Sequence, residues 1–304
     1  MIVSDVSYSE LCELLQTTGI KINIGPFTVG LMSDIPDVAQ NIYCLYSQYS
    51  LSRNDFVDFH IQLKKPTGFR RYFRPQVNFN FDGVFPFKPL PFAQSFAMFE
   101  WGLNWCVASY AHQYLILHSA VVEKNGFAAI LPGSPGAGKS TLCAALINNG
   151  WRLLSDEMSL ITPESLRLTP IPRPVSLKNE SIDIIASFVK DVKFGLMADD
   201  THKGSITHIK PPKDSVERSA IEAEPRWMIF PRYRTGSALV LNNLKKGSAF
   251  IRAAEQGFNY NVLGEDGFCA LSNLIDKVDT FELEYSLLDE AIDAFDQLSR
   301  EVIK

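Results

Sequence analysis

The sequence lacks the features of a membrane protein, a nucleic-acid-binding protein or a disulfide-rich protein. No uncharged apolar run reaches the roughly 18 residues of a membrane-spanning helix, so we expect no membrane partner. The net charge of −5 gives no general attraction for nucleic acid, and we expect no nucleic-acid partner. The five cysteines are scattered without a CxxC, which indicates reduced thiols rather than a disulfide framework or a zinc site.

The first residues also lack the pattern of a signal peptide, because no basic start precedes an apolar run. Together with the reduced cysteines, this predicts a cytoplasmic protein. The sequence has neither an internal repeat nor a low-complexity tract. Its 304 residues and 46% hydrophobic content suit a globular protein with one large core or two modest ones.

Residues 1–112 have the pattern of a smaller mixed α/β domain. Val77, Phe79 and Phe81 alternate with asparagines, which predicts a half-buried strand. The other expected elements are strands at 20–32 and 57–63, a helix at 34–50 and a long amphipathic helix at 91–113.

Residues 113–304 predict a second, larger domain. Asn125-Gly126 is the favoured pair for a two-residue type I′ turn, and apolar strands flank it. A strand–loop–helix–strand unit follows, which predicts a parallel pair of strands with a right-handed crossover. The expected elements are strands at 114–122, 126–131 and 151–162, a helix at 140–149, long loops over 162–225, strands at 226–230 and 280–285 with two helices between them, and a last helix at 287–303.

Residues 133–140 fit the phosphate-loop pattern GxxxxGK[ST]. The glycines let the backbone turn tightly, so that successive N–H groups and the N-terminus of the next helix face an anion. Lys139 would reach the β- and γ-phosphates of ATP, and the Ser140 hydroxyl would bind Mg²⁺. A chance glycine-rich turn is the alternative, but the order of strand, loop and helix favours nucleotide binding. The expected nucleotide-binding residues are Gly133, Ser134, Pro135, Gly136, Ala137, Gly138, Lys139, Ser140 and Thr141.

Asp156 and Glu157 follow the next expected strand. The carboxyl ends of parallel strands meet at one edge of a sheet, which predicts that this pair lies beside the phosphate loop. A carboxylate there can hold Mg²⁺ or accept the proton of an attacking hydroxyl. A solvated acidic pair is the alternative, but position and pairing favour a metal site made of Ser140, Asp156 and Glu157.

His118 lies in the first apolar strand of the second domain. A two-residue turn at Asn125-Gly126 would place His118 opposite Gly133, the first residue of the loop. A lone histidine in an apolar strand is commonly a core residue. Both interpretations, a core histidine and one that touches the transferred phosphate, stay open on the sequence.

The segments LILHSAVV, GSPGAGKST and WRLLSDEMSL together resemble the HPr kinase/phosphorylase family, in particular its HprK-related kinase A-like group. The resemblance covers about residues 114–304 and implies an α/β fold with a C-terminal P-loop-containing, HPr-kinase-like (PEP carboxykinase-like) domain. It implies that Asp156 is the catalytic base, that Glu157 is the second acid and that His118 is close to the phosphate. It also implies assembly of identical subunits.

Two departures separate the chain from the bifunctional enzymes of that family. Glu157 stands where they usually carry aspartate, and residues 170–179 stand in place of their RGxG signature. These differences favour a related kinase that acts on a target other than HPr, and they leave the phosphorylase reaction open.

Several cations could stabilise developing phosphoryl charge near the expected anion site. Most lysines and arginines in such loops are simply solvated, so we prefer one, Arg232, which follows an apolar strand. The others are Arg173, Lys178, Lys203 and His208.

Two weaker motifs are set aside. Residues 69–76 (FRRYFRPQ) interleave arginines with aromatics, but a solvated strand end explains them better than nucleic-acid binding. Residues 274–279 faintly resemble the NKxD motif of GTPases, but Asp276 replaces the asparagine and the surroundings predict a helix.

The leading hypothesis is an ATP-dependent kinase that uses Asp156 as base and transfers the γ-phosphoryl group to a hydroxyl, most simply Ser or Thr of a protein or peptide. A kinase of a small hydroxylated metabolite is an open alternative. A nucleotide-switched ATPase or binding protein, or a pure nucleotide sensor, represents a different class.

Overall fold

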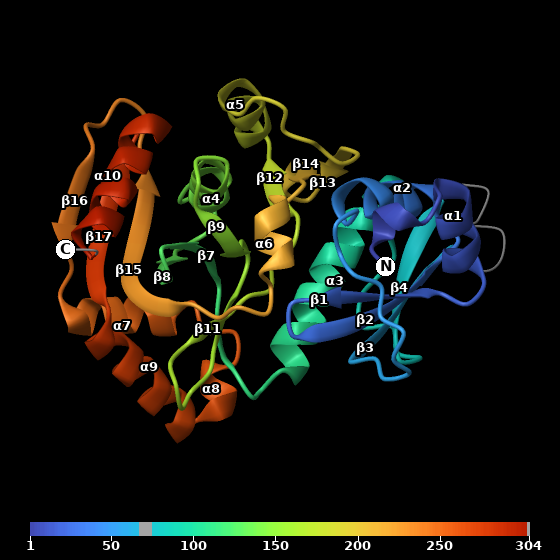
Figure 1. The fold of residues 1–304 in the computed structure, drawn as a ribbon, viewed down its shortest axis with the longest axis horizontal. Helices are drawn as coiled ribbons and strands as arrows, with labels where there is room; N and C mark the ends of the chain where they lie inside the picture. The colour runs from blue at the N-terminus through green and yellow to red at the C-terminus, as the bar shows by residue number, and fades with distance from the viewer. Residues whose placement is uncertain (67–74, 303–304) are drawn as a thin grey trace. The chain divides into compact units, whose positions relative to one another are not determined.

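The computed structural model describes residues 1–66 and 75–302, and it shows a mixed α/β protein with several sheets (Figure 1). The chain divides into two compact units. The first holds Met1–Val107, Arg173–Ala186 and Lys190–Glu217, and the second holds Ala108–Pro172, Ser187–Val189 and Arg218–Lys304. The first unit thus includes a segment from the middle of the chain, whereas the sequence analysis places residues 113–304 in one domain.

The first unit contains a five-stranded sheet in the order β1-β2-β3-β4-β5. Neighbouring strands are antiparallel except β2 and β3, which are parallel and are connected through α2. The elements are β1 (Ile20–Ile24), β2 (Phe27–Ser33), β3 (Phe59–Lys64), β4 (Gln76–Phe81) and β5 (Leu90–Pro91), with η1 (Val3–Asp5), α1 (Tyr8–Gln16) and α2 (Pro36–Leu45).

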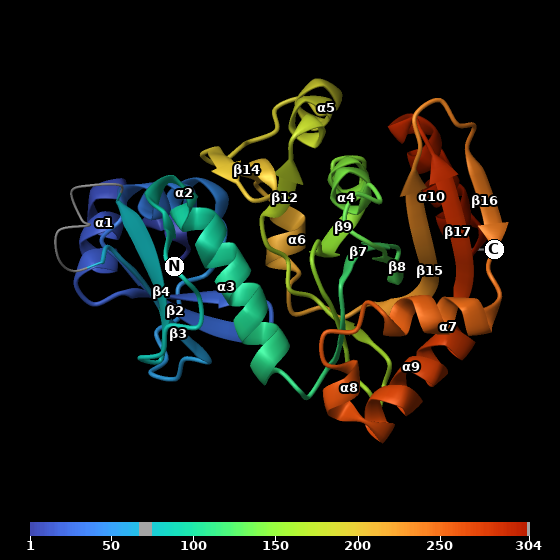
Figure 2. The ribbon, with the colours of Figure 1, turned by 180° about the vertical axis from the view of Figure 1, so that it is seen from behind.

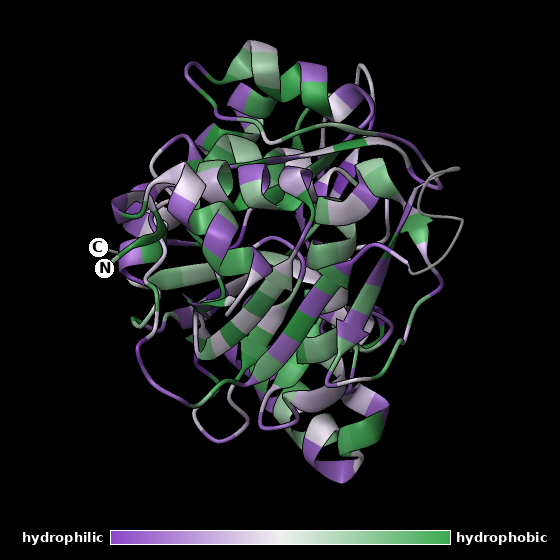
Figure 3. Ribbon diagram, turned by 90° about the vertical axis from the view of Figure 1, so that its right-hand side faces the viewer, coloured by the Kyte–Doolittle hydropathy of each residue, from purple (hydrophilic) through white to green (hydrophobic). Residues whose placement is uncertain are grey.

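The strand expected at 57–63 and the helix expected at 34–50 are present as β3 and α2, and β4 buries Val77, Phe79 and Phe81 as its alternation predicts. The single strand expected at 20–32 is instead the antiparallel pair β1 and β2, because the chain turns at residues 25–26. Bands of apolar and polar residues alternate along several strands of the ribbon in Figure 3, as expected for strands with one buried face. Of the motif at 69–76, residues 69–74 lie outside the described residues.

The helix expected at 91–113 is α3 (Ser95–Tyr110), preceded by the short helix η3 (Phe92–Gln94). The prediction that it is amphipathic is wrong, because every residue from Ser95 to Glu100 is buried. Glu100 of α3 belongs to a buried charged network. The Tyr46 hydroxyl donates to Glu100 Oε1 at 2.6 Å, and Arg173 Nη1 lies 3.2 Å from Glu100 Oε2. Burial and the Glu100 charge raise the pKa of Tyr46.

The same network explains why the middle segment belongs with the first unit. Arg173 is buried against α3, and breaking a buried ion pair would leave an uncompensated charge. The sequence predicted long loops over residues 162–225, and this prediction is wrong for the segment that follows Arg173. It forms the antiparallel sheet β12-β14-β13, composed of β12 (Val175–Lys178), β14 (Gly204–Ile209) and β13 (Ala198–Thr201), with α5 (Glu180–Phe188) and α6 (Lys213–Glu217). Short apolar stretches inside the polar composition, such as Val175 and Leu177, supply its buried side chains.

The second unit contains a six-stranded sheet in the order β16-β17-β15-β8-β7-β9, and a smaller sheet in the order β11-β10-β6. The strands of the large sheet are β7 (Ser119–Lys124), β8 (Phe127–Pro132), β9 (Arg152–Ser155), β15 (Glu224–Tyr233), β16 (Val240–Asn243) and β17 (Asp279–Tyr285). Those of the small sheet are β6 (Leu115–Leu117), β10 (Ser159–Ile161) and β11 (Leu168–Thr169).

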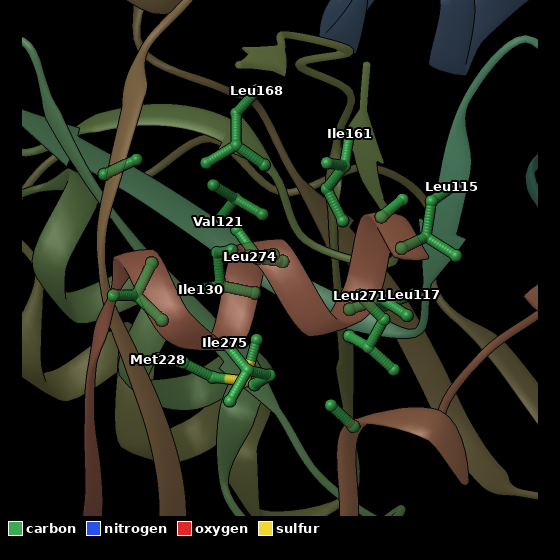
Figure 4. Close-up of a cluster of buried hydrophobic side chains, with 14 of the residues drawn as sticks. Leu115, Leu117, Val121, Ile130, Ile161, Leu168, Met228, Leu271, Leu274 and Ile275 are labelled. Atoms are coloured by element: carbon green, nitrogen blue, oxygen red, sulfur yellow. The ribbon is translucent and has the colours of Figure 1, made fainter. Parts of the chain in front are cut away.

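Five helices complete the second unit (Figure 2): α4 (Lys139–Ile147), α7 (Lys246–Ala254), α8 (Tyr260–Leu263), α9 (Glu265–Lys277) and α10 (Leu288–Glu301). Its core lies between α9 and the two sheets. Figure 4 shows Leu274 and Ile275 of α9 against Val121, Ile130 and Met228 of the large sheet. In the described chain, no helix is long and apolar enough to span a membrane.

We predict opposite effects of one substitution in two helices. A Cβ at Gly102 of α3 would lie 2.0 Å from Phe79 Cε2, so Gly102→Ala should overpack the core and destabilise the protein by about 1–3 kcal/mol. A Cβ at Gly247 of α7 would meet no atom within 4 Å, so Gly247→Ala should stabilise it by about 0.5–1 kcal/mol. Thermal unfolding of both variants tests the prediction, and a rise in Tm for Gly102→Ala would contradict it.

Candidate nucleotide site

The glycine-rich segment joins the end of β8 to the start of α4. Gly136 and Gly138 have φ values of 86° and 90°, in the left-handed region that favours glycine. Between them, the Ala137 N–H donates to Ser134 O at 3.2 Å and closes a turn. The motif is therefore a strand, a tight loop and a helix in immediate succession. Nucleotide binding by residues 133–141 stays a prediction.

Lys139, the first residue of α4, folds back over this loop. Its ammonium donates to the carbonyl oxygen of Gly133 and, at 3.3 Å, to that of Ser134. The residue is buried although it is charged. The carbonyl dipoles of the loop stabilise the buried ammonium. The positive charge of Lys139 is therefore held at the loop that is expected to bind phosphate.

Residues 115–124 and 152–161 run antiparallel to each other, and each segment is broken into two strands at the same point of their pairing. β7 pairs with β9 with Val121 opposite Ser155, and β6 pairs with β10 with Leu117 opposite Ser159. The continuous strands expected at 114–122 and 151–162 are therefore each broken in two. The pairing keeps its register across the interruption, but its two parts belong to different sheets. His118 lies in one break and Asp156, Glu157 and Met158 lie in the other.

The expectation that β8 and β9 form a parallel pair is also corrected. β7 lies between them and is antiparallel to both, and the parallel neighbour of β8 is β15. β8 and β9 nevertheless run in the same direction. Asp156, which follows β9, therefore leaves the sheet at the same edge as the loop that follows β8.

His118 lies just beyond the β7–β8 ladder. The predicted register holds from Lys124 opposite Phe127 to Ser119 opposite Pro132, around a turn in which Asn125 and Gly126 have positive φ. The ladder ends there and does not include a pair between His118 and Gly133. Instead the His118 N–H donates to Gln256 O at 2.7 Å.

The side chain of His118 meets Glu157 and Phe258. Its Nε2 lies 3.6 Å from Glu157 Oε2, and its ring centroid lies 5.6 Å from that of Phe258. About a quarter of each side chain of the His118–Glu157 pair is exposed. Such a pair is accessible from solvent, unlike a fully enclosed core histidine, and sequence reasoning did not join these two residues.

Asp156 turns to a different neighbour, Cys143 of α4. Asp156 is 5% exposed and Cys143 is fully buried. Burial raises the pKa of the Cys143 thiol, and the charge of Asp156 and a hydrogen bond to its carboxylate raise it further. Cys143 follows Lys139 by four residues and therefore lies one helical turn along α4. This contact places the Asp156 carboxylate beside the helix that begins at the loop.

The described residues contain no group of three or more His, Cys, Asp or Glu side chains suited to a metal ion. The predicted Mg²⁺ site of Ser140, Asp156 and Glu157 has only two carboxylates. That donor set fits Mg²⁺, which is commonly bound by one or two carboxylates together with substrate phosphates and water. Binding of a metal by these residues stays a prediction.

The preferred cation, Arg232, is exposed near the end of β15. The next residue, Tyr233, donates its N–H to Ala137 O of the loop at 3.1 Å, so the end of β15 lies against the loop. Two of the other cations are engaged inside the first unit. Arg173 is paired with buried Glu100, and the buried His208 ring packs edge-on against Phe96.

Sequence reasoning missed Cys143 and Tyr285. The spacing of four residues from Lys139 could have indicated Cys143, because residues i and i+4 share a helix face. Tyr285 ends β17, and its hydroxyl donates to Gly138 O at 3.1 Å. No local pattern identifies this contact, because it joins residues that are 147 positions apart.

No protein-family model matches the chain, and no curated protein matches its sequence. Among solved structures, the chain is similar to the Hpr(Ser) kinase/phosphatase from Coxiella burnetii, with 13% identity and a TM-score of 0.28. The match covers 61% of this chain and 98% of that one. A likeness this distant carries no conclusion about function, and the proposals below depend on the residues of the chain itself.

We predict that Cys143 resists alkylation in the native protein. The thiolate is the reactive form, and burial together with Asp156 raises the pKa of the Cys143 thiol, so little thiolate forms at pH 8. Cys269 is exposed and provides the matched control. Mass spectrometry after brief treatment with iodoacetamide should show modification at Cys269 and none at Cys143. Equal labelling of both would contradict the buried position of Cys143.

Proposed function

We propose that the protein is an ATP-dependent phosphotransferase that moves the γ-phosphoryl group to a hydroxyl, most simply that of a serine or threonine in a protein or peptide. One observation carries the proposal: Asp156 is buried beside α4, the helix that begins at Lys139 of the glycine-rich loop. A carboxylate beside the helix that begins with the expected phosphate-binding lysine supplies two of the parts that phosphoryl transfer requires.

The loop and α4 supply the binding of the nucleotide. The N–H groups of residues 136–140 at the start of a helix provide donors and the positive end of the helix dipole. On binding, the Lys139 ammonium would exchange the carbonyls of Gly133 and Ser134 for phosphate oxygens. Mg²⁺, held by Ser140 and the carboxylates of Asp156 and Glu157, would neutralise phosphate charge when bound.

Asp156 is the proposed base. It is buried beside α4, the helix that begins at the loop, where a carboxylate could accept the proton of an entering hydroxyl. Glu157 keeps its side chain on His118, so the two adjacent acids have different surroundings. His118 would donate a hydrogen bond to phosphoryl oxygens, and Glu157 would orient its ring. Arg232 is the proposed additional cation at this edge of the sheet.

The acceptor is the part of the proposal that the chain specifies least. A small hydroxylated metabolite fits the same chemistry, as does water in a nucleotide-switched ATPase. We favour a hydroxyl acceptor over water because the motifs of residues 114–304 resemble those of the HPr kinase/phosphorylase family. Assembly of identical subunits is part of the proposal.

We predict that Asp156→Asn strongly lowers the rate of phosphoryl transfer. Loss of a general base lowers kcat by roughly 10²- to 10⁴-fold. The variant would be incubated with γ-labelled ATP, Mg²⁺ and an extract of the source cells, and label would be followed into protein, small molecules and free phosphate. Asp276→Asn, which changes an exposed carboxyl of α9, is the matched control and should behave as wild type.

The fractions of this experiment separate the alternatives. Label in a protein band that disappears with Asp156→Asn supports the proposal and identifies the acceptor. Label in a small molecule keeps the reaction and changes the acceptor class. Label only in free phosphate contradicts the proposal and supports a nucleotide-driven switch.

We also predict that His118→Ala lowers kcat by roughly tenfold or more while the KM for ATP changes little, because His118 and Glu157 act on the transferred group. His112→Ala is the matched control, since His112 is exposed and lies just before β6. Steady-state kinetics with the identified acceptor provide the test. A variant with the kcat of wild type would show that the pair is structural.

A further inference from the structure

Two consecutive peptide groups of the glycine-rich loop are held from outside by the ends of neighbouring strands. Tyr233, at the end of β15, donates its backbone N–H to Ala137 O at 3.1 Å. Tyr285, at the end of β17, donates its hydroxyl to Gly138 O at 3.1 Å. The Gly138 carbonyl also accepts from Leu142 N at 2.9 Å, the first hydrogen bond of α4. Tyr285 is thus the side chain that meets the junction of loop and helix.

A bond to a carbonyl oxygen also fixes the N–H of the next residue. The peptide group is planar and, in the described chain, never cis, so C=O and N–H point in opposite directions. Holding Ala137 O therefore orients the Gly138 N–H, and holding Gly138 O orients the Lys139 N–H. Both N–H groups belong to the set that faces the expected phosphate.

Both tyrosines lie in close contact with the loop. A Cβ at Gly138 would lie 2.5 Å from Tyr285 Oη and 3.1 Å from Tyr233 Cβ, so the tyrosines pack directly on the loop. Tyr285 is 1% exposed, and its ring packs edge-on against Tyr233 with centroids 5.8 Å apart. Burial raises the pKa of Tyr285, so its hydroxyl keeps the proton that it donates.

We propose that Tyr285 is a positioning residue for nucleotide binding, which acts by fixing the peptide plane between Gly138 and Lys139 so that the Lys139 N–H is oriented toward the phosphates. This inference rests on the proposed function and adds to it the side chain that holds the loop ready for the anion. Preorganised donors bind tighter than flexible ones because less ordering accompanies binding.

The test compares Tyr285→Phe with Tyr260→Phe, which removes the hydroxyl of a partly buried tyrosine that packs against Phe250. Calorimetric titration with ATP and Mg²⁺ should show affinity roughly threefold to tenfold weaker for Tyr285→Phe, the equivalent of one net hydrogen bond, and unchanged for Tyr260→Phe. Hydrogen exchange without nucleotide should show a faster Leu142 amide, which donates to the same Gly138 carbonyl, in Tyr285→Phe alone.

The outcomes separate the role of Tyr285 from the proposed function. Unchanged ATP affinity in Tyr285→Phe, with a wild type that binds ATP, overturns the positioning role and leaves the proposed function intact. A fall in Tm without a change in affinity or in Leu142 exchange gives Tyr285 a purely structural role. A wild type that binds no ATP contradicts the proposed function, and with it the role of Tyr285.

Discussion

The common direction of four strands is the constraint on which the candidate site depends. β15 is parallel to β8 and to β17, and β9 runs the same way because antiparallel β7 separates it from β8. All four strands therefore end at one edge of the sheet. Parallel strands place their following residues at that edge, where ligands of open α/β sheets commonly bind. Each of the four contributes a different part of the site.

The contributions differ in their physical role. β8 leads into the glycine-rich loop, and β9 leads into Asp156 and Glu157. β15 and β17 end in tyrosines that hold the loop, and Arg232 precedes one of them. Expected binding groups, a proposed base and a supporting layer thus lie at one edge of the sheet, and the contact between Tyr285 and Gly138 joins residues 147 positions apart. A loop that is already held by hydrogen bonds needs less ordering when a ligand binds.

The interruption of two paired strands gives the acidic residues separate surroundings. In a continuous strand, adjacent side chains would point to opposite faces of one sheet. Here the chain leaves one sheet after Ser155 and enters another at Ser159, so that Asp156 meets Cys143 of α4 and Glu157 meets His118. One carboxylate is enclosed and the other is partly exposed, a difference that suits one to proton transfer and the other to orientation of the histidine.

The sequence by itself determined the local features. The Asn125-Gly126 turn, the glycines with positive φ and the helix after Lys139 follow from backbone sterics within a few residues. Strands with alternating burial, such as β4, follow from their period of two. The order of strand, loop and helix around the phosphate-loop motif is also determined locally, as is the position of two acids after the next strand.

Only the tertiary structure decided which of these residues meet. It inserted β7 between β8 and β9, and it broke two apolar segments that look continuous in sequence because each serves two sheets. It also placed Arg173 in the core of the first unit, where Glu100 neutralises a cation that the sequence suggests for an anion site. The physical reason is the same in each case: pairing with a distant strand or a buried charge is worth more than local preference, and sequence periodicity does not record the partner.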